Sequence, residues 1–457
     1  MREFSLDNGI KCLLNDSDCK CHQSVSVVVM FGVGSRDEPR DFYGLTHFAE
    51  HMFFKGTVNR PEPEMIPREI DRYGGYMNAV TSYDTTYYFI RIDWRHLEVA
   101  LDILSDMLFN SLFDQRKIDS EKEVVVNELK MYENDPSRLA YMLTSELVYS
   151  GTTLEHNIGG DIEKIRSATR NQFLTFVNHF YRPENTIVSI AGQIPGGFKS
   201  VKNLIAKYFD RKFNYNSMIT KQIDTKNGSK FVARKMFPNF MKFQKSDRFL
   251  YRVKRDMDGS NMVLGFPGYK YLSHDYYTML LISYILGKGM SSRLFIQVRG
   301  KRGLAYKISA FVESYQDIGG FYIQCATHGK DIKTTFKVIW AELQKVTNGD
   351  ITEEELEFAK DHAIGEDHLA RESTSNIAKS QAYDCLFFNR VISLNEFEKS
   401  VKSVKLSDIN RVAKELFQKN KLNVVVVSNV KIDLKNGALG KNLTKRNKVK
   451  YNKTKKV

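Results

Sequence analysis

Three side chains that can bind and use a metal ion lie within five residues of one another. His47, Glu50 and His51 belong to residues 44–57, GLTHFAEHMFFKGT, whose apolar spacing predicts a short helix with Gly56 as its C-terminal glycine. At about 100° per residue, the three side chains share one helix face. Two histidines at i and i+4 can direct ring nitrogens at one zinc ion, and a carboxylate beside them can take a proton from water. The segment therefore predicts a metal centre for hydrolysis.

A zinc ion held by two histidines needs a third protein ligand if one position is to stay open for water. Residues 118–131, IDSEKEVVVNELKM, predict a second helix with Asp119 or Ser120 as its N-cap. Glu121 and Glu128 are seven residues apart and so share a face of that helix. By spacing, Glu128 is the better ligand, and Glu121 can accept the second N–H of a ligating histidine. The alternative is a solvated acidic stripe on a surface helix.

These two segments resemble the pitrilysin/insulinase family of zinc peptidases, especially its mitochondrial-processing-peptidase-like branch. In this chain 76 residues separate the second histidine from the third ligand, and the likeness covers nearly all of residues 1–430. The resemblance implies one Zn²⁺ per chain, a supporting carboxylate at Glu121 and a general base at Glu50. It implies three zinc ligands: His47, His51 and Glu128. The implied activity is that of a zinc metalloendopeptidase that hydrolyses extended or unfolded peptides.

A third segment resembles the family strand whose edge pairs with the substrate backbone. Residues 74–88, GGYMNAVTSYDTTYY, alternate polar and apolar types as a half-buried strand requires. The resemblance places Asn78 and Ala79 beside the scissile peptide. Main-chain hydrogen bonds to such an edge would give affinity with little sequence preference.

A fourth segment, residues 287–306, GKGMSSRLFIQVRGKRGLAY, resembles the glycine-rich loop and the Arg/Tyr pair of the family's partner domain. The loop falls on Gly287 and Gly289, and the pair falls on Arg299 and Tyr306. The resemblance implies that the guanidinium and the phenol stabilise the oxyanion of the tetrahedral intermediate. Without the resemblance, an Arg and a Tyr at this spacing predict nothing.

The elements around these motifs predict a duplication. Residues 173–181 and 409–417 show apolar residues at helical spacing, 236 positions apart, and an apolar strand-like run follows each of them. We expect an α+β fold of two homologous domains, each a largely antiparallel β-sheet packed by α-helices, as a duplicated α/β-roll. We expect four segments: 1–210, the catalytic zinc-binding domain; 211–246, a linker; 247–430, a homologous peptidase-like domain; and 431–457, a disordered basic tail.

The formal charge of +14 lies mostly at one end of the chain. Residues 431–457 carry +9 of it, which leaves only +5 for the remainder. Such a lysine-rich end predicts a disordered, solubilising tail, with a localisation signal or a polyanion-binding tail as alternatives. Nucleic-acid binding through this tail is a further class of function, which the modest charge of the remainder disfavours.

Cysteines and apolar runs add three expectations. The five cysteines predict free thiols rather than a disulfide framework. Cys19, Cys21 and His22 are expected in a hairpin turn between strands at 10–14 and 24–30, where an exposed turn is favoured over a metal cluster. No apolar run reaches the roughly 18 residues of a membrane span, and no signal or transit peptide is evident, so a cytoplasmic location is expected.

The expected partners are peptides and a second chain. Large members of the family enclose their substrate with four homologous domains, whereas this sequence predicts two. The resemblance therefore implies a homodimer, or a heterodimer with a related chain, in which Arg299 and Tyr306 act in the chain's own site or, as we favour, in its partner's. The rival hypothesis is a structural core subunit or a catalytically dead partner, which the retained histidines and Glu50 disfavour.

Overall fold

The computed structural model describes residues 1–16, 23–213, 234–237, 240, 248–253 and 259–429. These residues form two compact units that are each discontinuous in sequence. The first unit contains residues 1–129, 156–235 and 366–394, and the second contains the remainder. The predicted tail, the cluster of Cys19, Cys21 and His22, and most of the predicted linker lie outside the described residues.

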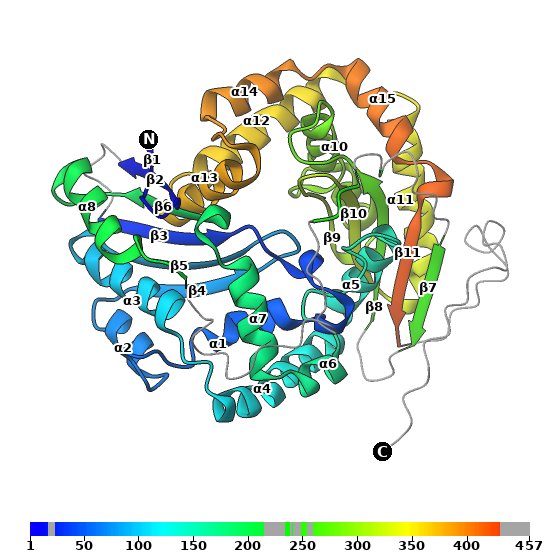
Figure 1. The fold of residues 1–457 in the computed structure, drawn as a ribbon. Coiled ribbons are helices and arrows are strands. Elements are labelled where there is room, and N and C mark those ends of the chain that lie inside the picture. The colour runs from blue at the N-terminus through cyan, green and yellow to red at the C-terminus, as the bar shows by residue number, and fades with distance from the viewer. Residues whose placement is uncertain (17–22, 214–233, 238–239, 241–247, 254–258, 430–457) are drawn as a thin grey trace. The chain divides into compact units, whose positions relative to one another are not determined.

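The first unit is built on a six-stranded sheet with the strand order β1-β2-β6-β3-β5-β4 (Figure 1). The strands are β1 (Arg2–Ser5), β2 (Lys11–Asp16), β3 (Ser24–Phe31), β4 (Tyr76–Thr81), β5 (Thr86–Asp93) and β6 (Thr186–Gly192). All neighbours are antiparallel except β2 and β6. The predicted hairpin of β2 and β3 is wrong, because the fully buried β6 lies between them and pairs with both. A strand that is apolar on both faces is typical of the interior of a sheet that is covered on both faces.

Helices cover both faces of this sheet. Helix α13 (Thr374–Phe388) packs on β3 and β6, where Ala378 and Ala382 meet Val28 and Met30 in one apolar cluster. Helix α3 (Leu97–Asn110) packs on β3 and β5, on the other side of the sheet in Figure 1. The valine-rich β3 is buried on both faces as a result. The remaining helices of the unit are α1 (Leu45–Met52), α2 (Met65–Asp71), α4 (Gln115–Asn134), α6 (Ile162–Ser167), α7 (Arg170–Phe180) and α8 (Gly197–Phe209).

Two predicted helix limits need correction. Helix α4 begins about one turn before the predicted cap, because the carboxylate of Asp114 accepts the backbone N–H groups of Arg116 and Lys117. Helix α1 ends at Met52, ahead of Gly56, as the chain tightens into shorter-range turns. Both corrections leave the predicted metal-binding side chains on helices.

The second unit contains a five-stranded sheet with the order β7-β11-β8-β10-β9. Its strands are β7 (Arg248–Val253), β8 (Ser260–Gly268), β9 (Ala305–Ser314), β10 (Gly319–Thr327) and β11 (Asn423–Ser428). Its helices are α5 (Pro136–Val148), α10 (Tyr276–Gly287), α11 (Ile332–Thr347), α12 (Glu353–Ala370), α14 (Leu394–Ser403) and α15 (Leu406–Leu416). Helix α5 packs on β8 and β11 as α13 packs on β3 and β6. Each unit therefore holds a helix from the opposite half of the sequence.

The predicted α+β duplication is confirmed. Helix α7 leads into β6 as α15 leads into β11, and each sheet has a single parallel pair that involves that last strand. The domain limits at residues 210 and 247 stay a prediction. Cys12, Cys325 and Cys385 are free and buried, as expected. Within the described part of the chain, no helix is both long and apolar enough to cross a membrane.

Candidate metal centre

The start of α1 is fixed by a glycine and a buried carboxylate. Gly44 has a left-handed φ of 94°, and a Cβ atom there would lie 2.5 Å from the carbonyl oxygen of Gly159. The carboxylate of Glu38 accepts the backbone N–H groups of Gly44 at 2.8 Å and Thr46 at 2.6 Å. Burial raises the pKa of Glu38 to about 8, against these hydrogen bonds, which favour its charged form. The Glu38 side chain, from the turn before α1, thus caps the helix that presents the motif.

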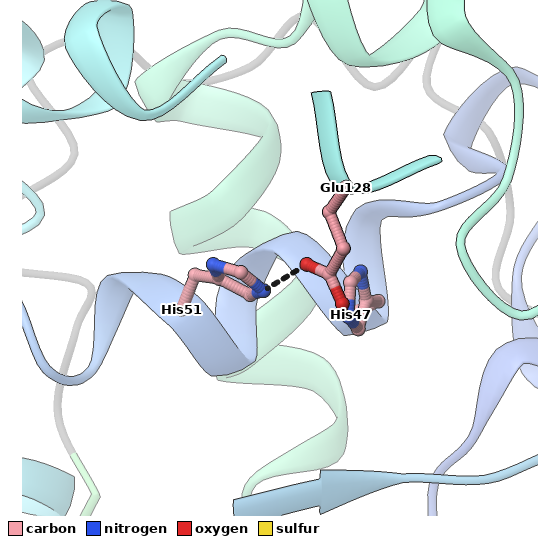
Figure 2. Close-up of side chains that lie close together, drawn as sticks. All are labelled: His47, His51 and Glu128. Atoms are coloured by element: carbon pink, nitrogen blue, oxygen red, sulfur yellow. Dashed lines mark ion pairs between the residues drawn. The ribbon is translucent and has the colours of Figure 1, made fainter. Parts of the chain in front are cut away.

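The structure brings the three predicted zinc ligands together. His47 and His51 project from successive turns of α1 toward Glu128 of α4 (Figure 2). The His51 Nε2 atom lies 3.3 Å from Glu128 Oε2, and the His47 Nε2 atom lies 3.9 Å from Glu128 Oε1. One ligand atom from each of the three residues lies within 4.8 Å of the others.

This donor set fits a zinc ion. Zinc bonds to imidazole nitrogen and carboxylate oxygen at about 2.0–2.2 Å, so tetrahedral ligand atoms lie roughly 3.3–3.5 Å apart. Two imidazoles and one carboxylate supply three donors and leave one coordination position for water or substrate, the pattern of catalytic zinc sites. The side chains are 14% exposed for His47, 20% for His51 and 23% for Glu128, so the centre is shielded yet open to solvent.

A second layer of charge orients His51. Its Nδ1 atom lies 3.0 Å from Glu121 Oε1, and Glu121 Oε2 lies 2.6 Å from the ammonium group of Lys55. Burial raises the pKa of Glu121, but the hydrogen bonds to His51 and Lys55 outweigh it and lower that pKa overall. Burial lowers the pKa of His51, but its hydrogen bonds to Glu121 and Glu128 outweigh this effect and raise it to about 9. A metal ion that binds here must displace a proton.

Glu50 stands beside the ligands and makes a different contact. Its Oε2 atom accepts a hydrogen bond of 2.5 Å from the hydroxyl of Thr81, the last residue of β4. Burial raises the pKa of Glu50, although the Thr81 hydrogen bond lowers it. A carboxylate with a raised pKa is a stronger base, which suits a group that takes protons.

The predicted substrate strand is the edge strand β4. It pairs with β5 on one side and ends the sheet on the other. Asn78 is exposed and donates through Nδ2 to the Tyr76 hydroxyl at 3.0 Å, while Ala79 is buried. Both residues therefore lie on a strand whose outer edge takes no part in the described sheet.

The second-half candidates belong to the second unit. Gly287 ends α10, where a Cβ atom would lie 2.2 Å from the Ala310 backbone nitrogen, and Gly289 has a left-handed φ of 79°. Arg299 lies in the π-helical turn η6 (Phe295–Gly300), with its guanidinium 4.8 Å from the Phe295 ring centroid. The Tyr306 residue at the start of β9 is 67% exposed. The side chains of the candidate metal centre belong to the first unit, and a catalytic role for Arg299 and Tyr306 stays a prediction.

Sequence reasoning did not identify three supporting residues: Glu38, Lys55 and Thr81. Thr81 contacts Glu50, Lys55 contacts Glu121, and Glu38 caps the start of α1. Lys55 follows His51 at i+4, a spacing that hints at a shared side. Thr81 lies on a strand apart from the motif, and Glu38 contacts α1 across an irregular turn, so helical or strand periodicity carries no signal for either residue.

Comparisons with protein families place peptidase models on most of the chain. The model described as insulinase (peptidase family M16) matches residues 17–161, and the model described as the peptidase M16 inactive domain matches residues 167–362. The uncharacterized zinc protease YmxG of Bacillus subtilis is 30% identical over 91% of this chain and 96% of its own length. An uncharacterized zinc protease of Rickettsia felis is 29% identical over 89% of this chain and 93% of its own.

Solved structures give the same picture of the fold. A protease from Helicobacter pylori superimposes with a TM-score of 0.82 and 25% identity, covering 93% of this chain and 99% of that one. A peptidase M16 inactive domain from Pseudomonas fluorescens superimposes with a TM-score of 0.77 and 18% identity, over 94% of this chain and 98% of that one. The likeness in each case extends through both halves of the sequence.

Proposed function

Because the chain belongs to the insulinase family of peptidases, peptidase family M16, and is a zinc protease, we propose that it is a metalloendopeptidase that hydrolyses extended or unfolded peptides. The observation that carries the proposal is the convergence of His47, His51 and Glu128 within 4.8 Å, with Glu50 on the same helix face. We assign the catalytic role to the predicted domain of residues 1–210, and a supporting role to that of residues 247–430.

In the proposed mechanism each side chain of the centre has a separate task. His47, His51 and Glu128 hold the metal, and Glu121 fixes the ring orientation and tautomer of His51 through its 3.0 Å contact. When bound, zinc supplies Lewis acidity, which makes water more acidic and polarises a peptide carbonyl. Glu50 takes the proton from the attacking water and passes it to the leaving amine. No covalent link between enzyme and substrate is needed.

Peptide binding is assigned to the edge of β4. An extended peptide would add to this edge as a further strand, with Asn78 and Ala79 beside the bond to be cleaved. Thr81, at the end of the same strand, donates to Glu50, and so links the peptide-binding element to the base. Arg299 and Tyr306 are proposed to stabilise the negative charge that develops on the substrate carbonyl oxygen.

We further propose that the active form is a dimer, either of two copies or with a related chain. The support is the duplication itself, because two homologous units per chain would have to be doubled to give the four that enclose substrate in large relatives. A purely structural role is disfavoured, since the described chain retains the base and the complete donor set.

Replacement of Glu50 tests the proposal. Glu50→Gln is expected to keep about one zinc per chain while it reduces peptide hydrolysis by 10² or more, because only proton transfer is lost. His47→Ala, in contrast, should reduce zinc content and activity together. Zinc analysis and cleavage of a mixed peptide library, with and without chelator, provide both measurements. The exposed Glu123→Gln on α4 is the matched control. Full activity of Glu50→Gln would rule out the assigned base.

A further inference from the structure

The face of the first sheet that α13 covers is left partly open at its β4 end. Helix α13 packs on β3 and β6 and reaches β5, whereas on β4 the side chains of Tyr76 and Val80 are 56% and 37% exposed. Antiparallel partners share a sheet face, and the register pairs Val80 with Tyr87 and Asn78 with Phe89. Phe89 packs in the α13 cluster, so these β4 side chains point to the α13 side.

One lysine of α13 stands over this open face. The ammonium group of Lys379 lies 3.8 Å from the ring centroid of Phe89 and 5.5 Å from that of Tyr87. Among the residues that the structure describes, no carboxylate lies within ion-pair distance of Lys379. We call the surface formed by Tyr76, Val80, Tyr87, Phe89 and Lys379 the Lys379 shelf.

The charge of this surface is one-sided. From the Tyr76–Arg91 pair to the Val80–Tyr87 pair, the β4 and β5 positions on this face hold no acidic residue. Arg91 adds a second, exposed cation there. Burial lowers the pKa of Lys379, which indicates that the ammonium group has given up part of its hydration. A partly desolvated cation over aromatic rings is stabilised strongly by an anionic group that binds to it from the solvent-exposed side.

A peptide on the edge of β4 would send side chains to this surface. Side chains of a strand alternate between the two faces of the sheet. One set would face the Thr81 side, where the metal centre lies, and the other set would face the Lys379 shelf. The added strand would lie about two strand spacings, roughly 9–10 Å, from the strand under Lys379. Glutamate spans this gap better than the shorter aspartate.

We propose that the Lys379 shelf is a specificity subsite that binds a glutamate side chain of an extended peptide paired with β4. The inference rests on the proposed peptidase function and adds a substrate preference to it. Tyr76 and Val80 contact the methylene groups of that side chain, and the ammonium group of Lys379 pairs with its carboxylate. Lys379 thus acts on substrate selection and takes no part in the chemical step.

Binding to a protein that cannot turn over tests this subsite directly. Labelled decapeptides of uncharged background, with one glutamate moved along the sequence, are titrated into zinc-loaded Glu50→Gln protein and followed by fluorescence anisotropy. Glutamate is expected to tighten binding about three- to tenfold over glutamine, at alternate positions only, because a strand presents every second side chain to one face. Aspartate should give a smaller gain.

Substitution of the lysine identifies the group responsible. Lys379→Met keeps an unbranched apolar chain over the rings and should abolish the glutamate preference. Lys199→Met, an equal charge change at an exposed position of α8, should preserve it. Lys379→Glu should instead favour lysine in the same peptide positions. If Lys379→Met leaves the preference intact, or weakens all peptides equally, the lysine is only a structural contact and the inference is overturned.

The same peptides separate this inference from the proposed function. Equal binding of the glutamate and glutamine peptides, with both cleaved by the wild-type chain, would overturn the subsite and leave the peptidase function standing. If the glutamate preference in binding depends on Lys379 but the zinc-loaded wild type cleaves no peptide, the subsite would stand and the peptidase function would be overturned. Lack of binding by every peptide would overturn the subsite as well.

Discussion

The two glutamates beside the candidate zinc ligands lie in different environments, which suit them to different roles. Glu121 accepts from Lys55 and His51, which hold its pKa below the usual range and keep it ionised. Glu50 accepts a hydrogen bond from the Thr81 hydroxyl, and burial raises its pKa. A permanently charged carboxylate suits the orientation of a histidine, and a more basic one suits proton transfer.

Substitution of Glu121 should weaken zinc binding without abolishing it. In Glu121→Gln, the amide can still contact His51 Nδ1, but the negative charge that makes the imidazole a better ligand is gone. We expect roughly a 10- to 100-fold loss of zinc affinity in a competition titration with a chelator. Glu123→Gln on the same helix controls for a general effect on α4. Unchanged affinity would assign Glu121 to an acidic surface stripe.

At the scale of elements, the approach of two backbones fixes α1. Gly44 and Gly160 both have positive φ, and a Cβ atom on Gly160 would lie 2.2 Å from the Gly44 Cα atom. The loop before α6 therefore touches the start of the metal-binding helix through main-chain atoms. This contact fixes the residue at which α1 begins. It leaves no room for a side chain at position 44 or 160.

The substitution Gly44→Ala, compared with Gly74→Ala, distinguishes the effect of steric crowding on stability from that of backbone strain. Gly44→Ala is expected to lower the free energy of unfolding by about 2 kcal/mol or more, because it adds overlap with the Gly159 carbonyl to left-handed strain. Gly74→Ala is the matched control, since its φ is +62° but nothing lies within 4 Å, and strain alone should cost about 1 kcal/mol. Denaturant unfolding measures both. If both substitutions lower the free energy of unfolding equally, crowding against the Gly159 carbonyl does not contribute to the effect.

Local sequence patterns predicted several helices correctly, but they did not predict which elements pack or pair with one another. The apolar spacing around His47 and the repeat of α7 and α15 predicted helices that the structure contains, because periodicity reports which side of an element is buried. The insertion of β6 between β2 and β3 was not predicted, since strand pairing depends on residues more than 150 positions away. The contact of Thr81 with Glu50 was not predicted either, because it joins a strand to a helix and no local periodicity relates the two.

At the scale of the whole molecule, the proposed dimer raises the question of whether Tyr306 would act in its own chain's site or in its partner's. We expect that a mixture of two inactive chains, Glu50→Gln and Tyr306→Phe, regains activity, up to about half that of a wild-type dimer per heterodimer. Regain is expected because an intact base and an intact tyrosine then meet in one of the two sites. Each chain assayed alone is the control.

Two results would contradict this prediction. If subunits exchange, as checked with differently tagged chains, and the mixture stays inactive, Tyr306 acts within its own chain. If the wild-type protein cleaves peptides while it sediments as a monomer, the dimer itself is excluded. Neither result would alter the assignment of the metal centre.

The placement of α13 in the first unit also has a consequence for biosynthesis. The last strand of the first sheet, β6, ends at Gly192, but the helix that covers β3 and β6 is not complete until Phe388. At roughly 5–20 residues per second, a ribosome needs about 10–40 s to make the intervening chain. A sheet that formed in that interval would expose its valine-rich face to water and to chaperones. The sheet of the first unit is therefore fully covered only after α13 has been synthesised.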